Sequence, residues 1–251
     1  MVGMLPRLVF FDVDNTLTES KQPLSPEKVG LMTEILRHTK VAITSGAKLS
    51  LITHQIPDQL PEEVRGNLYM LPASGSALYE YKEETWTAVY EYLFTHEEVE
   101  EVRAAFIKAG TNTGLIDFST PSIGERIEWR GSEVALTAPG QEAPIDVKAA
   151  WDPERTKRTK LREVLLPLLP NYEVRIAGRS TIDVTKKGID KAYGVQQISK
   201  HLNIPISDMI YIGDALFPGG NDEVVKKSGI KTHQVKDPKE TEQMMESLLA
   251  S

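Results

Sequence analysis

The sequence predicts an α/β protein with a Rossmann-like parallel-sheet core and an inserted α+β cap domain. Short apolar segments alternate with helix-like segments at the start of the chain, which is typical of a parallel sheet. In the middle of the chain, strand-like segments are separated by short turns, which favours an antiparallel sheet. The alternation returns after Gly188. We therefore expect the core to comprise residues 1–84 and 188–251, and the cap residues 85–187.

The core elements follow from local patterns. Apolar segments at residues 8–11, 41–43 and 69–72 resemble strands that are buried on both faces of a sheet. A helix is expected after Ser25, because a serine cap followed by Pro26 and Glu27 is a typical helix start. Further helices are predicted over 49–55 and 191–202, a strand over 209–212, and a charged, solvated helix over 237–251.

Within the cap we predict two helices and four strands. The helices are expected over residues 96–109 and 152–166. The strands are expected over residues 126–129, 133–137, 172–176 and 180–184. Sequence patterns place such boundaries to within a few residues.

Composition excludes several classes of function. The 251 residues carry 29 Lys and Arg against 36 Asp and Glu, a net charge of −7 that disfavours general nucleic-acid binding. The chain has no cysteine, which excludes disulfides, thiolate metal sites and a cysteine nucleophile. Met1–Arg7 lacks the pattern of a targeting sequence, and no apolar segment approaches the ~20 residues that span a bilayer. We expect a cytoplasmic protein with no membrane partner.

The residues that suggest chemistry lie where predicted strands end. Asp12 and Asp14 flank Val13 just after the first strand, so in extended backbone their side chains start on the same side. Ligands of open α/β sheets bind at this carboxyl edge. An Asx-type turn explains these residues, taken alone, equally well.

A second acidic turn follows the strand at 209–212. It contains Asp214, and Asn221 and Asp222 come shortly after it. Oxygen ligands from several strand ends suit Mg²⁺, which binds a few carboxylates together with water and substrate phosphate. These positions therefore favour a magnesium site.

Ser45 and Lys191 complete the set of candidate residues. Ser45 follows the second strand, where it could bind a phosphoryl oxygen or simply cap a helix. Lys191 opens a predicted helix and could balance carboxylates and phosphate, although a lone lysine is usually solvated. Together with the aspartates, these groups suit phosphoryl transfer through an aspartyl phosphate.

These motifs, in this order, resemble those of the haloacid dehalogenase superfamily. The resemblance rests on residues 12–16, Ser45, Lys191 and residues 213–222, and the full set is far more specific than any one motif. The inserted domain resembles the type IIB cap. Residues 126–130, 180–184 and 213–222 are also similar to the eukaryotic-type phosphomannomutases.

The resemblance implies roles for individual residues. Asp12 would be the nucleophile and Asp14 the general acid and base, while Ser45 and Lys191 would bind the transferring phosphoryl group. Mg²⁺ would be held by Asp12, the backbone carbonyl of Asp14 and Asp214, with Asn221 and Asp222 nearby. In the cap, Arg130, Thr181 and Asp183 match positions that contact the sugar phosphate, although surface or sheet-edge roles would also explain them.

The chain departs from the mutase pattern at positions that bind phosphate. Lys21 stands where the mutases have arginine, and Gln141 follows Gly140 where they have Gly-Arg. Lysine keeps the charge but loses the bidentate geometry of a guanidinium. A mutase must hold the second phosphate of a bisphosphorylated intermediate, so weaker anion recognition favours release and hydrolysis.

We therefore expect a Mg²⁺-dependent phosphatase that acts on a small phosphorylated metabolite such as a sugar phosphate. The alternatives are a phosphomannomutase and a catalytically silent sugar-phosphate-binding protein. A homodimer is compatible with each of these. A response-regulator receiver also has a phosphorylated aspartate, but it would be about half as long and would lack the second aspartate.

Overall fold

The computed structural model describes residues 5–250. Residues 1–4, which belong to the segment that we expect to lack a targeting sequence, and residue 251 lie outside the described residues. The chain divides into two compact units, Met1–Glu91 with Ile189–Ser251, and Tyr92–Gly188. Residues 85–91, which we expected in the cap, belong to the first unit, because β5 (Thr85–Glu91) pairs with β4 (Ala77–Lys82).

The first unit is built on a seven-stranded sheet in the order β11-β10-β1-β2-β3-β4-β5. β11, β10, β1, β2 and β3 are parallel to one another, and the hairpin of β4 and β5 extends the sheet in antiparallel fashion. The remaining strands are β1 (Leu8–Asp12), β2 (Lys40–Thr44), β3 (Leu68–Leu71), β10 (Met209–Gly213) and β11 (Lys231–Gln234). The predicted parallel core is confirmed. The hairpin and β11 were not predicted.

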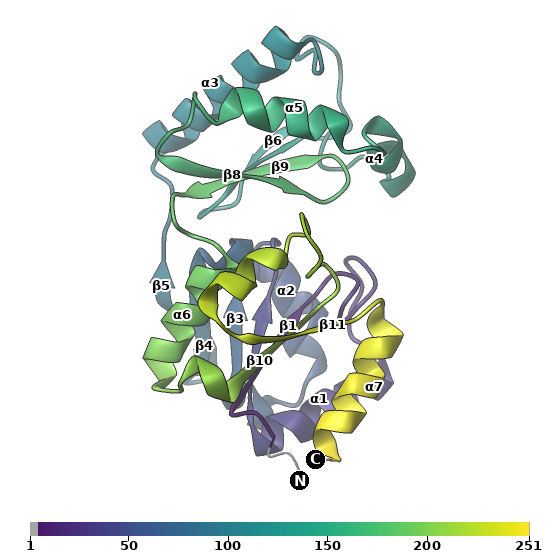
Figure 1. The fold of residues 1–251 in the computed structure, drawn as a ribbon, viewed down its shortest axis with the longest axis vertical. Coiled ribbons are helices and arrows are strands. Elements are labelled where there is room, and N and C mark those ends of the chain that lie inside the picture. The colour runs from purple at the N-terminus through teal and green to yellow at the C-terminus, as the bar shows by residue number, and fades with distance from the viewer. Residues whose placement is uncertain (1–4, 251) are drawn as a thin grey trace. The chain divides into compact units, whose positions relative to one another are not determined.

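Helices cover both faces of this sheet (Figure 1). The helices are α1 (Pro26–His38), α2 (Leu49–Gln55), α6 (Lys191–Leu202) and α7 (Pro238–Leu249). The Ser25 hydroxyl accepts a hydrogen bond from the backbone N–H of Lys28, which confirms the predicted start of α1. Alternate residues of β1 enter two cores, Val9 and Phe11 on the side of α1, and Leu8 and Phe10 on the side of α6.

The carboxyl-terminal helix is docked rather than solvated. Met245 is fully buried and Leu248 is nearly so, and both belong to the core that contains α1 residues. The expectation of a solvated helix is therefore wrong. The charged residues that suggested solvation occupy the other face of α7, and its apolar residues recur at helical spacing.

Short 3₁₀ helices lie in the connections between the strands and helices of the first unit. They are η1 (Pro57–Gln59), η2 (Glu62–Asn67), η3 (Ala73–Gly75), η4 (Ile206–Asp208) and η5 (Glu223–Ser228). Two of them lie next to candidate site residues or the strands that carry them, since η3 follows β3 and η5 begins directly after Asp222.

The second unit is a four-stranded antiparallel sheet in the order β6-β7-β9-β8. Its strands are β6 (Ile127–Trp129), β7 (Val134–Thr137), β8 (Tyr172–Ala177) and β9 (Thr181–Lys186), and its helices α3 (His96–Thr113), α4 (Ile145–Trp151) and α5 (Thr156–Leu165). One face packs against α3 and α5 through an apolar core, and the other face is polar. α5 begins later than expected, and α4 was not predicted because none of its residues is buried.

Over residues 5–250, no helix has both the length and the apolar character that a membrane-spanning segment requires.

Candidate active site

Strand β1 carries the first candidate residue into the interior. Asp12 is the last residue of this buried strand and is 4 % exposed. The following loop is tight, because the carbonyl of Val13 accepts hydrogen bonds from the backbone N–H groups of Thr16, Leu17 and Thr18. Asn15 has a φ of 60°, which asparagine tolerates better than most residues. The loop thus directs the chain away from Asp12 and leaves its carboxylate at the carboxyl edge of the sheet.

Asp14 is more exposed to solvent than Asp12. Its side chain is half-buried, and its Oδ1 accepts a hydrogen bond of 2.9 Å from the backbone N–H of Lys21. Lys21 itself has a φ of 63° and an exposed side chain. The hydrogen bond between Asp14 and Lys21 therefore uses the Lys21 backbone N–H and not the Lys21 ammonium group.

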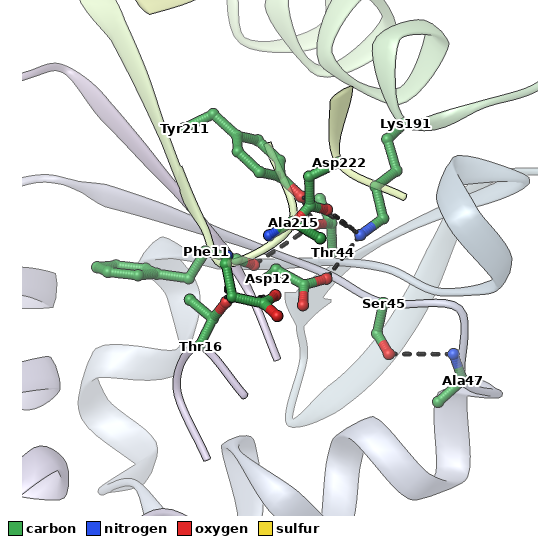
Figure 2. A network of polar contacts seen from close by, with 11 residues as sticks. Phe11, Asp12, Thr16, Thr44, Ser45, Ala47, Lys191, Tyr211, Ala215 and Asp222 are labelled. Atoms are coloured by element: carbon green, nitrogen blue, oxygen red, sulfur yellow. Dashed lines mark hydrogen bonds and ion pairs between the residues drawn. The ribbon is translucent and has the colours of Figure 1, made fainter. Parts of the chain in front are cut away.

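Lys191 lies at the start of α6 and points to the end of β1. Asp190 caps the helix by accepting the backbone N–H of Tyr193. The Lys191 Nζ lies 2.6 Å from Asp12 Oδ1 and 2.5 Å from Asp222 Oδ1 (Figure 2). Burial alone would lower the pKa of Lys191, but the two carboxylates reverse this and hold it well above its usual range. The solvated-lysine explanation is therefore excluded, since Lys191 is 2 % exposed.

Asp222 is already surrounded by donors. In addition to Lys191, its Oδ1 accepts a 2.8 Å hydrogen bond from the Tyr211 hydroxyl, and its Oδ2 accepts one of 3.3 Å from the backbone N–H of Ala215. This fully buried carboxylate therefore holds Lys191 in place. Its neighbour Asn221 is exposed.

Two residues of this network were not predicted. The Tyr211 hydroxyl lies 2.9 Å from Thr44 Oγ1 and 3.4 Å from Lys191 Nζ, and all three side chains are buried (Figure 2). Burial and the nearby Asp222 carboxylate raise the pKa of Tyr211 well above its usual value, so its hydroxyl stays protonated and can donate. Both residues lie in apolar strand segments, where the sequence shows no sign of a polar role.

Three carboxylates lie close enough to bind one cation. Asp12, Asp214 and Asp222 each offer an oxygen within 4.8 Å of the others. Burial raises the pKa of Asp12 and Asp214, and the proximity of Asp222 raises both further. Thr16 orients Asp214, because its Oγ1 lies 3.0 Å from the Asp214 backbone N and 3.3 Å from its Oδ1. Carboxylates that lie this close together, two of them buried and Asp214 partly buried, fit a divalent cation such as Mg²⁺, which binds oxygen ligands.

Ser45 follows β2 beside this network (Figure 2). It is 2 % exposed, and its Oγ accepts a 3.0 Å hydrogen bond from the backbone N–H of Ala47. It does not cap the next helix, because the N-cap of α2 is Lys48 and has no side-chain bond. The helix-cap explanation is therefore wrong. Ser45 instead shapes a loop whose hydroxyl and N–H groups suit an anion.

In the second unit, Arg130 and Asp183 belong to one polar network. Arg130 donates hydrogen bonds to Glu128 and Glu133, each at 2.8 Å, and its Nη1 lies 3.8 Å from Asp183 Oδ1. Thr181 Oγ1 lies 2.9 Å from Thr137 Oγ1 on the neighbouring strand. Glu133 was not predicted, since a lone glutamate before a strand is usually solvated.

Curated phosphomannomutases resemble this chain along nearly its whole length. The sequence profile of the family described as "Eukaryotic phosphomannomutase" matches residues 29–251, a range that begins after the loop of Asp12 and Asp14. The "Probable phosphomannomutase" of Caenorhabditis elegans is 25 % identical over 250 residues, covering 96 % of this chain and 95 % of the relative. The phosphomannomutase of Encephalitozoon cuniculi is 27 % identical over 255 residues, with coverage of 96 % and 93 %.

Solved structures show the same fold. IMP-bound Plasmodium falciparum IMP-nucleotidase superposes with a TM-score of 0.71 at 18 % identity, over 98 % of this chain and 68 % of that one. SMU.1108c from Streptococcus mutans superposes with a TM-score of 0.65 at 14 % identity, over 98 % and 100 %. The chain therefore belongs to the eukaryotic phosphomannomutase family and is a haloacid-dehalogenase-type enzyme, a phosphatase or a phosphohexomutase.

Proposed function

We propose that this protein transfers the phosphoryl group of a small sugar phosphate to Asp12 in a Mg²⁺-dependent reaction. The observation that carries the proposal is the position of Lys191, bonded to Asp12 at 2.6 Å and to Asp222 at 2.5 Å, with Asp214 in the same cluster. Lys191 balances charge on the nucleophile and on the phosphoryl oxygens. Bound Mg²⁺ would neutralise charge between Asp12 and the phosphate.

Each step has a residue of this chain to perform it. Asp12 attacks phosphorus, and the bond to the leaving oxygen breaks while Asp14, protonated, donates to that oxygen. Asp14 then accepts a proton from the incoming hydroxyl, which cleaves the aspartyl phosphate. Ser45 and its loop bind phosphoryl oxygens during both steps.

The family match favours a sugar hydroxyl as the acceptor. The relatives that cover nearly the whole chain are named phosphomannomutases, so interconversion of mannose 1-phosphate and mannose 6-phosphate has better support than the hydrolysis expected from the sequence. This interpretation requires a bisphosphorylated intermediate to bind in two orientations.

Hydrolysis is a second candidate, favoured by one observation. The Arg130 guanidinium is engaged by Glu128, Glu133 and Gln141 within its own unit, and a guanidinium bonded to carboxylates recognises phosphate less strongly. Phosphorus NMR of the protein with Mg²⁺ and mannose 1-phosphate, with and without a hexose bisphosphate primer, separates the candidates. The 6-phosphate isomer indicates a mutase, and free inorganic phosphate indicates a phosphatase.

Replacement of Asp12 tests the nucleophile. Asp12→Asn is expected to lower Mg²⁺-dependent turnover by about a thousandfold or more, because an amide is not a nucleophile at phosphorus. Asp58→Asn, at an exposed aspartate of η1, is the matched control and should leave turnover unchanged. Retained activity in Asp12→Asn would refute the proposal. Ligand binding without turnover in the unaltered protein would indicate the catalytically silent alternative.

A further inference from the structure

Gln55 is a buried polar residue of the first unit that the proposed mechanism does not use. It is the last residue of α2 and is 1 % exposed. Its backbone carbonyl accepts a 3.0 Å hydrogen bond from the N–H of Leu24. Its side-chain amide donates to the Gln22 carbonyl at 3.1 Å and, more weakly, to Thr18 Oγ1 at 3.5 Å. Gln55 therefore contacts both ends of residues 18–24, a segment far from it in the sequence.

This segment continues the loop that carries Asp14. Asp14 and Thr18 pair as an isolated β-bridge. The chain then turns, and the backbone N–H of Gln22 donates to the Glu19 carbonyl at 2.9 Å. Within this turn, the backbone N–H of Lys21 donates to Asp14 Oδ1 at 2.9 Å. The position of the Asp14 carboxylate therefore depends on the position of the turn.

The turn has little apolar packing of its own. Residues 19 and 21–23 are exposed, and Lys21 has a φ of 63°, a conformation that residues other than glycine adopt uncommonly. Leu17 and Leu24 anchor the two ends of the turn in the apolar core. Between these anchors, the Gln55 amide supplies a hydrogen bond to the backbone of the turn itself.

The helix that carries Gln55 is a fixed base for this contact. α2 begins four residues after Ser45. Ile52 and the following Ile56 are fully buried in the same apolar core that contains Leu17 and Leu24. A close-packed core allows little displacement of such side chains. Gln55 therefore connects the flexible part of the Asp14 loop to a rigid part of the first unit.

We propose that Gln55 is a positioning residue for Asp14. This inference rests on the proposed function, since it names the contact that holds the acid and base of that reaction in place. Without the Gln55 amide, the Gln22 carbonyl loses a donor, and the turn that presents the Lys21 N–H to Asp14 is free to move. Proton transfer depends steeply on such placement, because the acid must lie within hydrogen-bond distance of the oxygen that it protonates.

The test uses two substrates that differ in their need for a proton. Turnover of mannose 1-phosphate, with the bisphosphate primer present, requires proton transfer at a sugar oxygen. p-Nitrophenyl phosphate releases a phenolate that departs without a proton, and its kcat/KM reports only the steps up to that release. Gln55→Met removes the amide donor and keeps a flexible side chain of similar length in the core. Both constants are measured for the unaltered protein and for the variant.

We expect the two substrates to respond differently. In Gln55→Met, kcat/KM for mannose 1-phosphate should fall about a hundredfold, as for a reacting group displaced by about 1 Å. The value for p-nitrophenyl phosphate should fall by less than about threefold, since its leaving group needs no acid. Hydrogen exchange should become faster at the backbone amides of residues 15–22.

Gln59→Met is the matched control. The Gln59 amide donates to the His54 carbonyl at 3.0 Å, so its loss should leave both kcat/KM values and the exchange of residues 15–22 unchanged. Circular dichroism checks the fold of each variant. If Gln55→Met does not fold, Gln55→Asn draws the amide back from the Gln22 carbonyl by one carbon–carbon bond and gives the same comparison.

Two results would overturn the inference. Equal falls in kcat/KM for the two substrates would show a general structural role, and unchanged exchange over residues 15–22 would show that Gln55 does not hold the loop. Absence of Mg²⁺-dependent turnover of both substrates in the unaltered protein would instead contradict the proposed function. The exchange measurement needs no substrate, so it would still decide whether Gln55 holds the loop of Asp14.

Discussion

At the scale of single residues, the candidate site depends on polar groups that the core would otherwise exclude. Asp12, Lys191 and Asp222 are each at most 4 % exposed. Burying one charge alone is costly, whereas three groups in mutual contact compensate one another in part. The hydroxyl of Tyr211 adds a donor where the lysine cannot satisfy every oxygen. Removal of any one of these groups would leave the others buried with fewer partners, so the stability of the network depends on all of its members.

Tyr211→Phe tests this dependence. Loss of the hydroxyl removes one of the donors to Asp222 Oδ1 and leaves the buried Thr44 hydroxyl without its Tyr211 partner, so we expect the unfolding free energy to fall by about 1–3 kcal/mol. Turnover should fall while KM changes little, because Lys191 loses a neighbour that fixes its position. Urea unfolding and steady-state kinetics measure both effects. Tyr81→Phe, whose hydroxyl contacts exposed Glu62, is the control. Equal effects in the two variants would contradict the prediction.

Glu133 should make stability depend on pH. Its pKa is about 8 in the folded protein, above the ordinary 4.5. The folded chain therefore keeps a proton that the unfolded chain releases between pH 4.5 and 8, and stability falls as pH rises through this window. Below pH 4.5 Glu133 is protonated in both the folded and the unfolded chain, so its full contribution to the free energy of unfolding is present.

Urea unfolding at pH 5.5 and pH 8 measures this contribution. Glu133→Gln should lose less stability between the two values than the unaltered protein does, because the amide does not titrate. Glu100→Gln should behave like the unaltered protein. Identical pH dependence in all three proteins would show that Glu133 is not the group responsible.

At the scale of elements, the turn η3 couples two parts of the site. Ser74 donates its backbone N–H to the carbonyl of Ser45 at 2.9 Å. On its other side, a Cβ at Gly75 would lie 2.7 Å from the carbonyl oxygen of Asp190, the cap of the helix that carries Lys191. Ala73, Ser74 and Gly75 all have positive φ. The turn is therefore a strained spacer between the Ser45 loop and α6.

Gly75→Ala is expected to displace this spacer. The new methyl group collides with the Asp190 carbonyl and occupies a φ of 89°, so stability should fall by about 1–3 kcal/mol. Turnover should fall as well, because the start of α6 carries Lys191. Thermal unfolding and kinetics check both expectations. Gly66→Ala, where no atom lies within 4 Å of the added Cβ, should change neither. A neutral Gly75→Ala would refute the spacer role.

At the scale of the whole molecule, each unit has its own apolar core. Two core clusters lie on the two faces of the first unit's sheet, and a third lies in the second unit. The carboxylates of Asp12, Asp214 and Asp222 belong to the first unit, and the buried carboxyl groups of Glu133 and Asp183 belong to the second. Each unit should therefore respond to a different solution condition.

Calorimetry should resolve this difference. Mg²⁺ is expected to raise the unfolding temperature of one transition, because it would bind Asp12, Asp214 and Asp222 in the folded first unit and not in the unfolded chain. A second transition should be unaffected by Mg²⁺ and should shift with pH. Asp214→Asn should abolish the Mg²⁺ effect, and EDTA should reverse it. A Mg²⁺ shift that persists in Asp214→Asn would place the cation elsewhere.

Local patterns in the sequence determined much of this protein. The buried strands, the capped start of α1 and the extent of α6 depend on neighbouring residues, and the order of the acidic motifs indicated a phosphoryl-transfer enzyme. Other features depend on contacts between residues far apart in the chain, which no local pattern records. Only the tertiary structure placed the Tyr211 hydroxyl between Asp222 and Thr44, docked α7 on the core, and brought Glu133 and Asp183 to the same guanidinium. Burial is what turns these ordinary side chains into a site, and burial is a property of the folded chain.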